Sequence, residues 1–320
     1  MNLDKKIFKK IKGDASFRSF FRKKVRDKTS IIVYAKKEKK KNLLIYDAIN
    51  KILIKNGIKA PKILNNNYKQ NFIEIEDFGN FSIYSNLKKK KKYSEIFKKI
   101  IFLLKKIQKI KEKKTKNFEK NNYILPLYSK KILFNEAKLF MKWYVPININ
   151  KKKVTKLNKK LSNEIKYLLS KLKLKNDTFV HRDFHVSNLM IIKKKIGVLD
   201  SQDAVIGNKA YDLASLIDDV RIKTSKKTKN LIYNFYIDLN KNKINKNYFK
   251  NDFEILSVLR NLKIIGIFTR LAIRDNKKKY LKLIPYAWEL IESRINNNII
   301  FYNLKNCLDN NFSKKCRMKK

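Results

Sequence analysis

The sequence predicts an α+β fold, with a small antiparallel sheet lobe at the N-terminus and a larger, mainly helical lobe after it. Ile31–Ala35 is a short apolar run, and Phe72–Glu76 alternates between apolar and polar residues, as strands do. From Phe81 onward the apolar residues recur at helical spacing, for example along Ile96–Ile107. This change of period separates a sheet lobe from a helical lobe.

Further elements follow from local patterns along the chain. We expect an early helix, then a turn at Lys12–Phe17 that leads into a strand at Phe20–Phe21. A helix over Asn42–Lys55 should end at Gly57, because glycine readily adopts the conformation that closes a helix. Short apolar runs predict three more strands, at Thr178–Val180, Leu189–Ile192 and Ile196–Leu199.

The lobe boundary is placed where the helical period begins. Residues 1–78 are expected to form the nucleotide-binding lobe, and residues 79–312 the catalytic and acceptor-binding lobe. The basic tail at residues 313–320 is expected to be disordered, as chain ends without an anchor often are.

The charge of the chain is extreme but evenly spread. Lysine and arginine number 79 and aspartate and glutamate 27, which gives a formal net charge of +52. Such a charge is compatible with binding to nucleic acid or to an anionic membrane. The lysines, however, occur in most segments, together with abundant asparagine and isoleucine, as an AT-rich coding sequence would produce. A solvated lysine surface is therefore the default interpretation, and no specific nucleic-acid partner is expected.

Other features indicate a cytoplasmic protein without membrane contact. The first residues are charged and lack an apolar leader core, and the longest apolar runs are far shorter than the roughly 20 residues that span a bilayer. Cys307 and Cys316 lack the spacing of a disulfide framework or a metal site. A chain of 320 residues, 43% of them apolar, can bury a substantial core. We expect a monomer in a reducing compartment.

The strongest functional pattern lies between two of the short strands. His181, Asp183 and Asn188 form His-x-Asp-x-x-x-x-Asn, and Asp200 ends the next strand twelve residues later. Transfer of a γ-phosphoryl group requires metal ions with hard oxygen ligands and an acceptor for the proton of the attacking hydroxyl. Asn188 and Asp200 can supply the ligands, and Asp183 can accept the proton. The spacing therefore predicts phosphoryl transfer, with ATP and Mg²⁺ as cofactors.

Each of these residues also has a simpler role. A lone histidine such as His181 more often packs in a core than catalyses a reaction, and a lone Asp183 more often shapes a turn. The chain contains two histidines, His181 and His185, and both fall in this loop. Their occurrence together with the acid and the amide favours a catalytic loop. Asp203 is either a further metal ligand or an ordinary loop acid.

The loop and the segments Val198–Ala204 and Tyr211–Leu216 together resemble the aminoglycoside phosphotransferase superfamily, which has a protein-kinase-like fold of two lobes. Other segments resemble its branch of anomeric N-acetylmuramate/N-acetylglucosamine kinases, which act in cell-wall recycling. Lys263–Pro285 is the stretch that favours this branch. The other segments are Gly13–Arg18, Glu76–Gly79, Phe140–Tyr144, Leu262–Leu271, Arg274–Asp275 and Tyr280–Pro285.

The resemblance implies roles for the residues that match. Asp183 is implied to be the catalytic base, on a loop that includes His181. Asn188 and Asp200 are the implied magnesium ligands. Asp212 would brace the catalytic loop from the following helix, and it is also an acid at a helix N-terminus, where the helix dipole favours negative charge. Both roles of Asp212 are compatible.

The nucleotide is expected to bind to the first lobe. The chain has six glycines and no Gly-x-x-x-x-Gly-Lys-Ser/Thr motif, which excludes a P-loop. Gly13 and Ser16 lie in a turn whose amides can face phosphates, and an ordinary hairpin turn is the alternative. Glu76, Asp77 and Phe78 resemble the strand-to-helix hinge that binds adenine through backbone groups.

Two departures from the family pattern concern this lobe and the metal-binding segment. The strand Ile31–Lys37 has Tyr34 where related kinases tend to have aspartate, and the sequence does not identify the lysine that contacts the α- and β-phosphates. Ser201 stands where an aromatic residue usually follows the metal-binding aspartate. The resemblance therefore leaves the phosphate-binding cation unassigned.

The acceptor is expected over Asp183, walled by the helical lobe. Aromatic residues there can stack on a sugar ring, and arginines can bind a carboxylate such as the lactyl group of muramic acid. For each residue taken alone, helix packing or surface ion pairing is the simpler role. The candidates are Trp143, Tyr144, His185, Arg260, Arg270 and Arg274.

The expected activity is transfer of the γ-phosphoryl group of ATP to the anomeric hydroxyl of an amino sugar, a small-molecule substrate. A kinase of another small alcohol, such as choline, homoserine or an aminoglycoside, is the first alternative. Such cationic acceptors need an acidic pocket, for which Asp218 and Asp219 are candidates. A non-catalytic nucleotide-binding protein with a kinase fold is the second alternative. The complete Asp183, Asn188 and Asp200 set argues against it, whereas the unassigned lysine argues for it.

Overall fold

The computed structural model describes residues 7–11, 18–89, 94–296 and 298–318. The turn that contains Gly13 and Ser16 lies outside these residues. Residue contacts divide the chain into two compact units, which are described separately. The first unit comprises Met1–Pro126 and Thr178–Ile206, and the second comprises Leu127–Asp177 and Gly207–Lys320.

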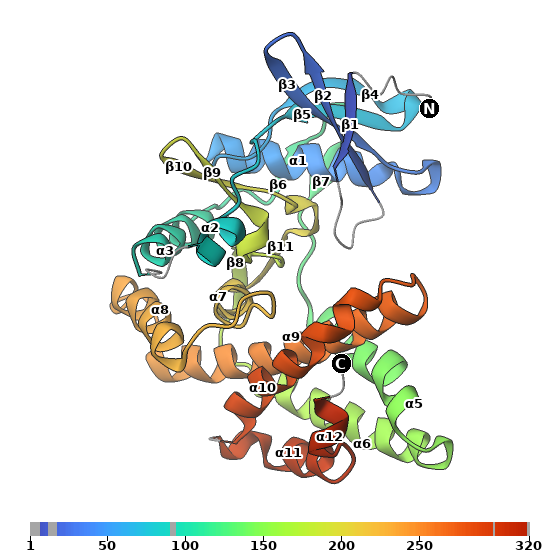
Figure 1. The fold of residues 1–320 in the computed structure, drawn as a ribbon. Coiled ribbons are helices and arrows are strands. Elements are labelled where there is room, and N and C mark those ends of the chain that lie inside the picture. Colours follow the sequence, from blue (N-terminus) through green and yellow to red (C-terminus); the bar gives the residue numbers. More distant parts are fainter. Residues whose placement is uncertain (1–6, 12–17, 90–93, 297, 319–320) are drawn as a thin grey trace. The chain divides into compact units, whose positions relative to one another are not determined.

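An antiparallel sheet is the main feature of the first unit (Figure 1). Its strand order is β1-β2-β3-β5-β4, and each strand pairs antiparallel with its neighbour. The early helix that the sequence suggested is wrong, because Phe8–Ile11 pairs with β2 as strand β1. The strands are β1 (Phe8–Ile11), β2 (Ser19–Val25), β3 (Lys28–Tyr34), β4 (Ile63–Asn67) and β5 (Phe72–Glu76).

Helix α1 (Lys41–Lys55) shares an apolar core with this sheet. Leu43 and Tyr46 from the helix and Val33 and Ile75 from β3 and β5 belong to that core. After the helix, Gly57 has a φ of +67°, a left-handed conformation that glycine adopts without strain. The predicted helix, its stop and the two predicted strands are confirmed.

The rest of the first unit is built on the hairpin of β9 and β10, which follows the loop His181–Asn188. The backbone N–H of Val198 donates to the carbonyl of Lys59 at 2.8 Å, and that of Ile191 donates to the carbonyl of Phe81 at 2.7 Å. These bonds join the hairpin to segments that flank the sheet. By residue contacts the hairpin therefore groups with the sheet. The functional division after residue 78 stays a prediction.

The remaining elements of the first unit are helices and short strands. The strands β8 and β11 pair with each other, as do β6 and β7. The elements are α2 (Ile83–Lys89), α3 (Ser94–Gln108), β6 (Lys114–Lys116), β7 (Asn122–Ile124), β8 (Asn176–Val180), β9 (Leu189–Ile192), β10 (Lys195–Val198) and β11 (Val205–Asn208). Strand β8 begins before the first unit's second segment, and β11 ends after it.

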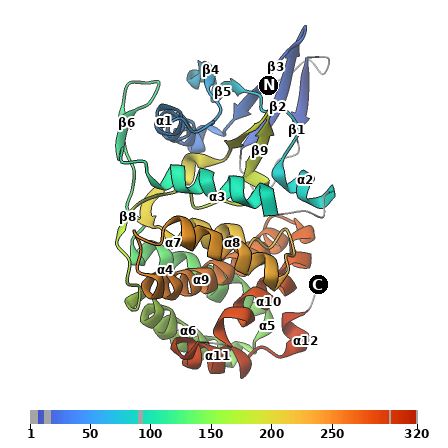
Figure 2. The ribbon, with the colours of Figure 1, turned by 90° about the vertical axis from the view of Figure 1, so that its left-hand side faces the viewer.

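The second unit is helical, and its longest helix is α9 (Lys246–Ile273). This helix packs against α4, α7 and α10 (Figure 2). The other helices are α4 (Lys130–Leu139), α5 (Val145–Asn148), α6 (Lys151–Ser170), α7 (Ala210–Ile217), α8 (Lys226–Leu239), α10 (Ile284–Ile295), α11 (Tyr302–Asp309) and α12 (Lys314–Arg317). A sheet in one unit and helices in the other confirm the predicted α+β class.

Helix α12 lies in the tail for which disorder was expected. The Arg317 guanidinium hydrogen-bonds to Glu292 at 2.7 Å and to Asp309 at 2.6 Å, and it lies 4.9 Å from the ring centroid of Trp288. These contacts anchor a helix where basic composition alone suggested a disordered end. Residues 319–320 lie outside the described part of the chain.

Gly266 marks a close approach of two backbones in the second unit. A Cβ atom at this position would lie 2.3 Å from the carbonyl carbon of Leu139 and 2.5 Å from the backbone nitrogen of Phe140. Backbone atoms cannot turn aside as the end of a side chain can. We expect Gly266→Ala to lower the free energy of unfolding by about 1–3 kcal/mol through overpacking, measured by urea denaturation. Ile273→Ala, at a residue of the same helix that is 54% exposed, is the control. An equal loss in both variants would contradict the close approach.

Among the helices of the described residues, none combines the length and the apolar character needed to cross a membrane.

Candidate active site

Two backbone hydrogen bonds shape the loop between β8 and β9. The N–H of His185 donates to the carbonyl of Asp183 at 3.0 Å, and the N–H of Asn188 donates to the carbonyl of His185 at 2.9 Å. Arg182 has a φ of 70°, the left-handed conformation that sharp turns use. The loop that carries the predicted catalytic residues therefore consists of hydrogen-bonded turns. It lies between β8, which pairs with β11, and β9, which pairs with β10.

The side chain of Asn188 is oriented by the same loop. Its Nδ2 donates to the carbonyl of Asp183 at 3.0 Å and lies 3.4 Å from Nε2 of His185. The backbone N–H of Leu199 donates to the carbonyl of Asn188 at 2.8 Å, which holds the residue preceding Asp200 beside the loop. Because the amide nitrogen is engaged by the protein, the amide oxygen is the group that Asn188 can offer to a cation.

His181 is a buried, neutral ring at the start of the loop. Burial lowers the pKa of its imidazole, and the negative charges of Asp183, Asp200 and Asp203 act in the opposite direction. The ring is fully buried and lies edge-on to Phe184, with centroids 6.1 Å apart. This environment indicates the packing role that the sequence left open for His181.

Asp200 reaches solvent from a strained turn. Its φ of 61° is left-handed, which is uncommon for a residue other than glycine. Its side chain is 38% exposed and forms an ion pair with Arg18. Nε2 of Gln202 donates to the same carboxylate at 3.1 Å and to Asp203 at 3.1 Å. The surroundings thus hold the Asp200 carboxylate in one place and leave it open to a small ligand.

The oxygens of Asn188 and Asp200 suit a magnesium ion. Mg²⁺ prefers hard oxygen ligands and is commonly bound by one or two protein oxygens together with the phosphates of a substrate. The described residues hold no group of three or more His, Cys, Asp or Glu side chains placed for a metal. In the predicted assignment, Asp200 would provide one carboxylate and Asn188 one amide oxygen. When bound, the ion would neutralise the charge of the phosphates.

Ser201 replaces the aromatic residue of the family pattern by a buried polar contact. Its Oγ donates to Oδ1 of Asn50 at 2.5 Å, and Nδ2 of Asn50 donates to the carbonyl of Pro61 at 2.9 Å. Both side chains are buried within the first unit. The departure at Ser201 therefore attaches the segment that follows Asp200 to α1.

The expected adenine hinge uses its side chains for structure. Oε1 of Glu76 lies 2.5 Å from Nζ of Lys59, and Asp77 accepts from Arg22 at 2.6 Å. Burial alone would raise the pKa of Asp77, but hydrogen bonds from Arg22 and from the amide of Gly79 hold it below its usual value. The acids of the hinge are thus paired with cations, which leaves backbone groups for a nucleotide, as the resemblance implies.

Phe78 packs the hinge segment against the hairpin of β9 and β10. Its ring is buried, and a Cβ atom on Gly197 would lie 2.7 Å from it. Because glycine has no Cβ atom, Gly197 allows this close contact. Gly79, with a φ of +77°, ends the hinge in a conformation that favours glycine.

A family model of the phosphotransferase enzyme family matches residues 7–230. This span covers the hinge, the loop and Asp200. The chain belongs to the phosphotransferase enzyme family. It is a phosphotransferase with an alcohol or sugar group as acceptor.

Curated relatives of this phosphotransferase carry one name. The N-acetylmuramate/N-acetylglucosamine kinase of Neisseria meningitidis serogroup B is 29% identical over 285 residues, which are 85% of this chain and 81% of that protein. The N-acetylmuramate/N-acetylglucosamine kinase of Pseudomonas aeruginosa is 26% identical over 291 residues, 88% of this chain and 82% of that protein. The predicted resemblance to this branch is confirmed.

Solved structures with the same fold are kinases of small alcohols. The choline kinase of Streptococcus pneumoniae has a TM-score of 0.63 at 11% identity and covers 89% of this chain and 93% of its own. A spectinomycin phosphotransferase in complex with ADP and spectinomycin has a TM-score of 0.57 at 14% identity and covers 94% of this chain and 92% of its own. At these identities the likeness shows the kinase-like fold alone.

The predicted acceptor residues of the phosphotransferase fall in both units. His185 lies in the first unit, and the others lie in the second. Tyr144 is buried: its hydroxyl accepts from Nε1 of Trp288 at 3.1 Å, and its ring stacks on Phe140 with centroids 5.2 Å apart. These contacts indicate a packing role, the alternative raised for Tyr144 from the sequence. Trp143 is half-buried in the π-helical turn Phe140–Tyr144.

The polar candidates of the second unit lie on two helices. Arg260 and Arg270 both lie on α9, the first buried and the second half-buried. Asp212 is fully buried in the first turn of α7. A role for Arg260 and Arg270 in acceptor binding, and for Asp212 as a brace, stays a prediction.

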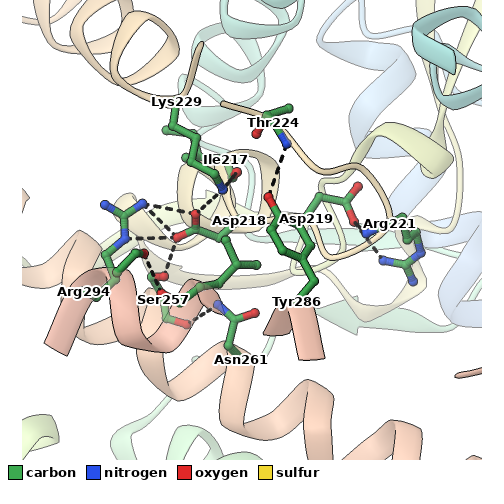
Figure 3. Close-up of polar contacts among 12 residues, drawn as sticks. Ile217, Asp218, Asp219, Arg221, Thr224, Lys229, Ser257, Asn261, Tyr286 and Arg294 are labelled. Atoms are coloured by element: carbon green, nitrogen blue, oxygen red, sulfur yellow. Dashed lines mark hydrogen bonds and ion pairs between the residues drawn. The ribbon is translucent and has the colours of Figure 1, made fainter. Parts of the chain in front are cut away.

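Asp218 is a fully buried acid that two cations neutralise (Figure 3). Its carboxylate accepts from Nζ of Lys229 at 2.9 Å, from Nη2 of Arg294 at 2.9 Å and from Oγ of Ser257 at 2.5 Å. Burial raises the pKa of Asp218, but Lys229, Arg294 and Ser257 together lower it to about 2. Asp218 is therefore ionised and fully paired at neutral pH.

Asp219 is also engaged. Its Oδ1 accepts from the backbone N–H of Arg221 at 3.0 Å and from the guanidinium of Arg221 at 3.4 Å (Figure 3). Both acids that the sequence offered for a cationic acceptor thus have basic partners from their own unit.

Sequence reasoning gave no role to Arg18 and Gln202, which both contact the Asp200 carboxylate. Both belong to segments that resemble the family, so their presence was visible. Arg18 precedes Asp200 by 182 positions, however, and a contact over that separation is invisible to local patterns.

Proposed function

We propose that this phosphotransferase is an ATP- and Mg²⁺-dependent kinase that phosphorylates the anomeric hydroxyl of an amino sugar, N-acetylmuramate or N-acetylglucosamine. One observation carries the proposal: relatives named for these two sugars match 85% or more of the chain and more than 80% of their own length. The match therefore includes regions on both sides of the loop, where an acceptor must also bind.

The residues of the first unit have separate tasks in this proposal. Asp183 accepts the proton of the sugar hydroxyl as that oxygen attacks the γ-phosphorus, a contribution that a positioned carboxylate can make. Asn188 and Asp200 would hold the metal, whose charge would stabilise the phosphates. The loop hydrogen bond from Asn188 Nδ2 to the carbonyl of Asp183, 3.0 Å long, fixes the proposed metal ligand Asn188 relative to the proposed base Asp183. Such positioning is the main demand of phosphoryl transfer.

The electrostatics of the second unit favour a neutral or anionic acceptor. A cationic alcohol such as choline requires carboxylates whose charge is not already compensated. Asp218 is paired with Lys229 and Arg294, and Asp219 with Arg221. Neither acid is set up to bind a second cation, so this observation disfavours the choline-type alternative.

The proposed setting is the recycling of peptidoglycan. Amino sugars released from the cell wall would be the substrates, and the use of ATP assigns the reaction to the cytoplasm. The partners in this proposal are small molecules.

A panel of acceptors tests the proposal. ADP release would be followed with Mg²⁺·ATP and, in separate reactions, N-acetylmuramate, N-acetylglucosamine, choline, homoserine and an aminoglycoside. We expect kcat/KM for one or both amino sugars to exceed that for every other acceptor by at least about 100-fold, equivalent to about 3 kcal/mol of transition-state binding. A higher value for choline or an aminoglycoside, or ADP release at a rate that no acceptor changes, would contradict the proposal. Binding of ATP without ADP release in any reaction would support the non-catalytic alternative.

A further inference from the structure

Arg18 is a buried cation beside the carboxylate that we assign to the metal. Its side chain is 3% exposed, Nη2 forms an ion pair with Asp200, and Nη1 donates to Oε1 of Gln202 at 3.0 Å. The guanidinium carbon lies 5.4 Å from the ring centroid of Phe20 and 5.8 Å from that of Tyr46. A carboxylate, an amide and two aromatic rings thus hold one positive charge next to Asp200.

The pair of residues that protein kinases use at the phosphates has no counterpart on β3 and α1, both of which the structure describes in full. Those enzymes place a lysine on the third strand and a glutamate on the following helix, and the lysine contacts the nucleotide phosphates. In this chain β3 contains a single lysine, Lys28, which is exposed at the first position of the strand. Helix α1 contains a single acid, Asp47, which pairs with Lys51 at 2.8 Å.

We propose that Arg18 binds the α- and β-phosphates of the nucleotide and takes the place of the missing lysine. The inference rests on the nucleotide part of the proposed function and is independent of the acceptor. Phosphates that share a metal with Asp200 must lie next to that carboxylate, which is where the Arg18 guanidinium is held. A guanidinium is also well suited to phosphate, because its N–H groups form charge-assisted, bidentate hydrogen bonds.

The burial of Arg18 makes the charge balance demanding. A guanidinium that is 3% exposed needs a negative partner, and Asp200 supplies it in the structure. If Asp200 also holds a metal ion, its carboxylate would be shared between two cations, and phosphate oxygens would supply the further negative charge that Arg18 needs. Arg18 therefore favours a nucleotide with phosphates over a bare nucleoside.

Calorimetric titration tests this on the full chain, without sugar and with MgCl₂ at saturation. ADP and adenosine would be titrated into the wild type, Arg18→Gln and Arg18→Lys. Lys24→Gln is the matched control, since it removes the same charge from an exposed position of β2, the strand that directly follows Arg18. We expect Arg18→Gln to weaken ADP binding by about 10- to 100-fold. Arg18→Lys should weaken it less, because lysine keeps the positive charge but cannot form the bidentate hydrogen bonds of a guanidinium. Adenosine affinity, and both affinities of Lys24→Gln, should stay within about twofold of the wild type.

Unchanged ADP affinity in both Arg18 variants would overturn the inference and leave Arg18 as a structural ion pair. An equal loss for ADP and adenosine would also overturn it, because a phosphate contact cannot affect adenosine. Circular dichroism checks that each variant folds. If Arg18→Gln does not fold, the ADP affinity of Arg18→Lys tests the inference alone. A wild type that binds ADP but phosphorylates no amino sugar overturns the proposed acceptor alone. A wild type that binds no ADP overturns both.

Discussion

Asp183→Asn is expected to lower kcat for sugar phosphorylation by about 10²- to 10⁴-fold, the usual contribution of a positioned general base. The amide keeps the size of the side chain and cannot take the hydroxyl proton. The loop bonds near it run through the backbone carbonyl of Asp183, which the substitution leaves in place. The affinity for ADP, measured by calorimetry, should therefore remain within about twofold of the wild type.

The control for this variant is Asp177→Asn, which changes an exposed acid on β8, the strand that leads into the loop. It should keep the rate of the wild type. If Asp183→Asn retained more than about a tenth of the wild-type kcat, Asp183 would not be the base. A parallel loss of ADP affinity would indicate a damaged loop instead of a missing base.

Asp218→Asn is expected to cost about 3–5 kcal/mol in the free energy of unfolding, because it leaves two cations in the second unit without their counter-charge. The Lys229 and Arg294 side chains are 14% and 18% exposed, so solvent compensates them poorly. Urea denaturation measures the change. The control is Glu289→Gln, which removes one partner of an exposed pair with Lys223 and should have little effect. Equal losses in the two variants would contradict the role of the buried cluster.

The same cluster predicts a pH dependence with a definite sign. The pKa of Asp218 falls from 3.8 to about 2 on folding, so the folded state holds this proton less tightly than the unfolded state. Its contribution of about 2 kcal/mol is present above about pH 4 and is lost as the pH falls through 2. The difference in stability between the wild type and Asp218→Asn should therefore shrink as the pH is lowered from 4 toward 2. A difference that stayed constant over this range would contradict the assignment.

Local sequence patterns predicted those helices and strands of the first unit whose formation depends on residues close together in the sequence. Helix α1 and the strands β3, β5, β9 and β10 appear where short-range periodicity indicated them. Gly57 ends α1 because the chain needs a left-handed residue there, a requirement that is also local. The early strand β1 was missed because its pairing with β2 outweighs a weak local preference for helix.

Contacts between distant residues account for most of what the sequence left open. The spacing of the acids showed Asp218 and Asp219 but gave no sign that Arg294, 76 positions from Asp218, neutralises the first of them. For Tyr144 the sequence left both sugar stacking and helix packing open, since it does not reveal that the hydroxyl accepts a hydrogen bond from Trp288. The contact of Arg18 with Asp200, on which our proposal for the phosphate-binding cation rests, was missed for the same reason, because the two residues are 182 positions apart.

The most direct measurement is ³¹P nuclear magnetic resonance of the product formed from Mg²⁺·ATP and N-acetylmuramate or N-acetylglucosamine. We predict a single sugar phosphate, with the phosphorus coupled to the anomeric proton and one ADP formed for each sugar consumed. Phosphorus coupled to the protons at C6, or ADP formed without any sugar phosphate, would contradict the assignment of this chain as an anomeric amino-sugar kinase.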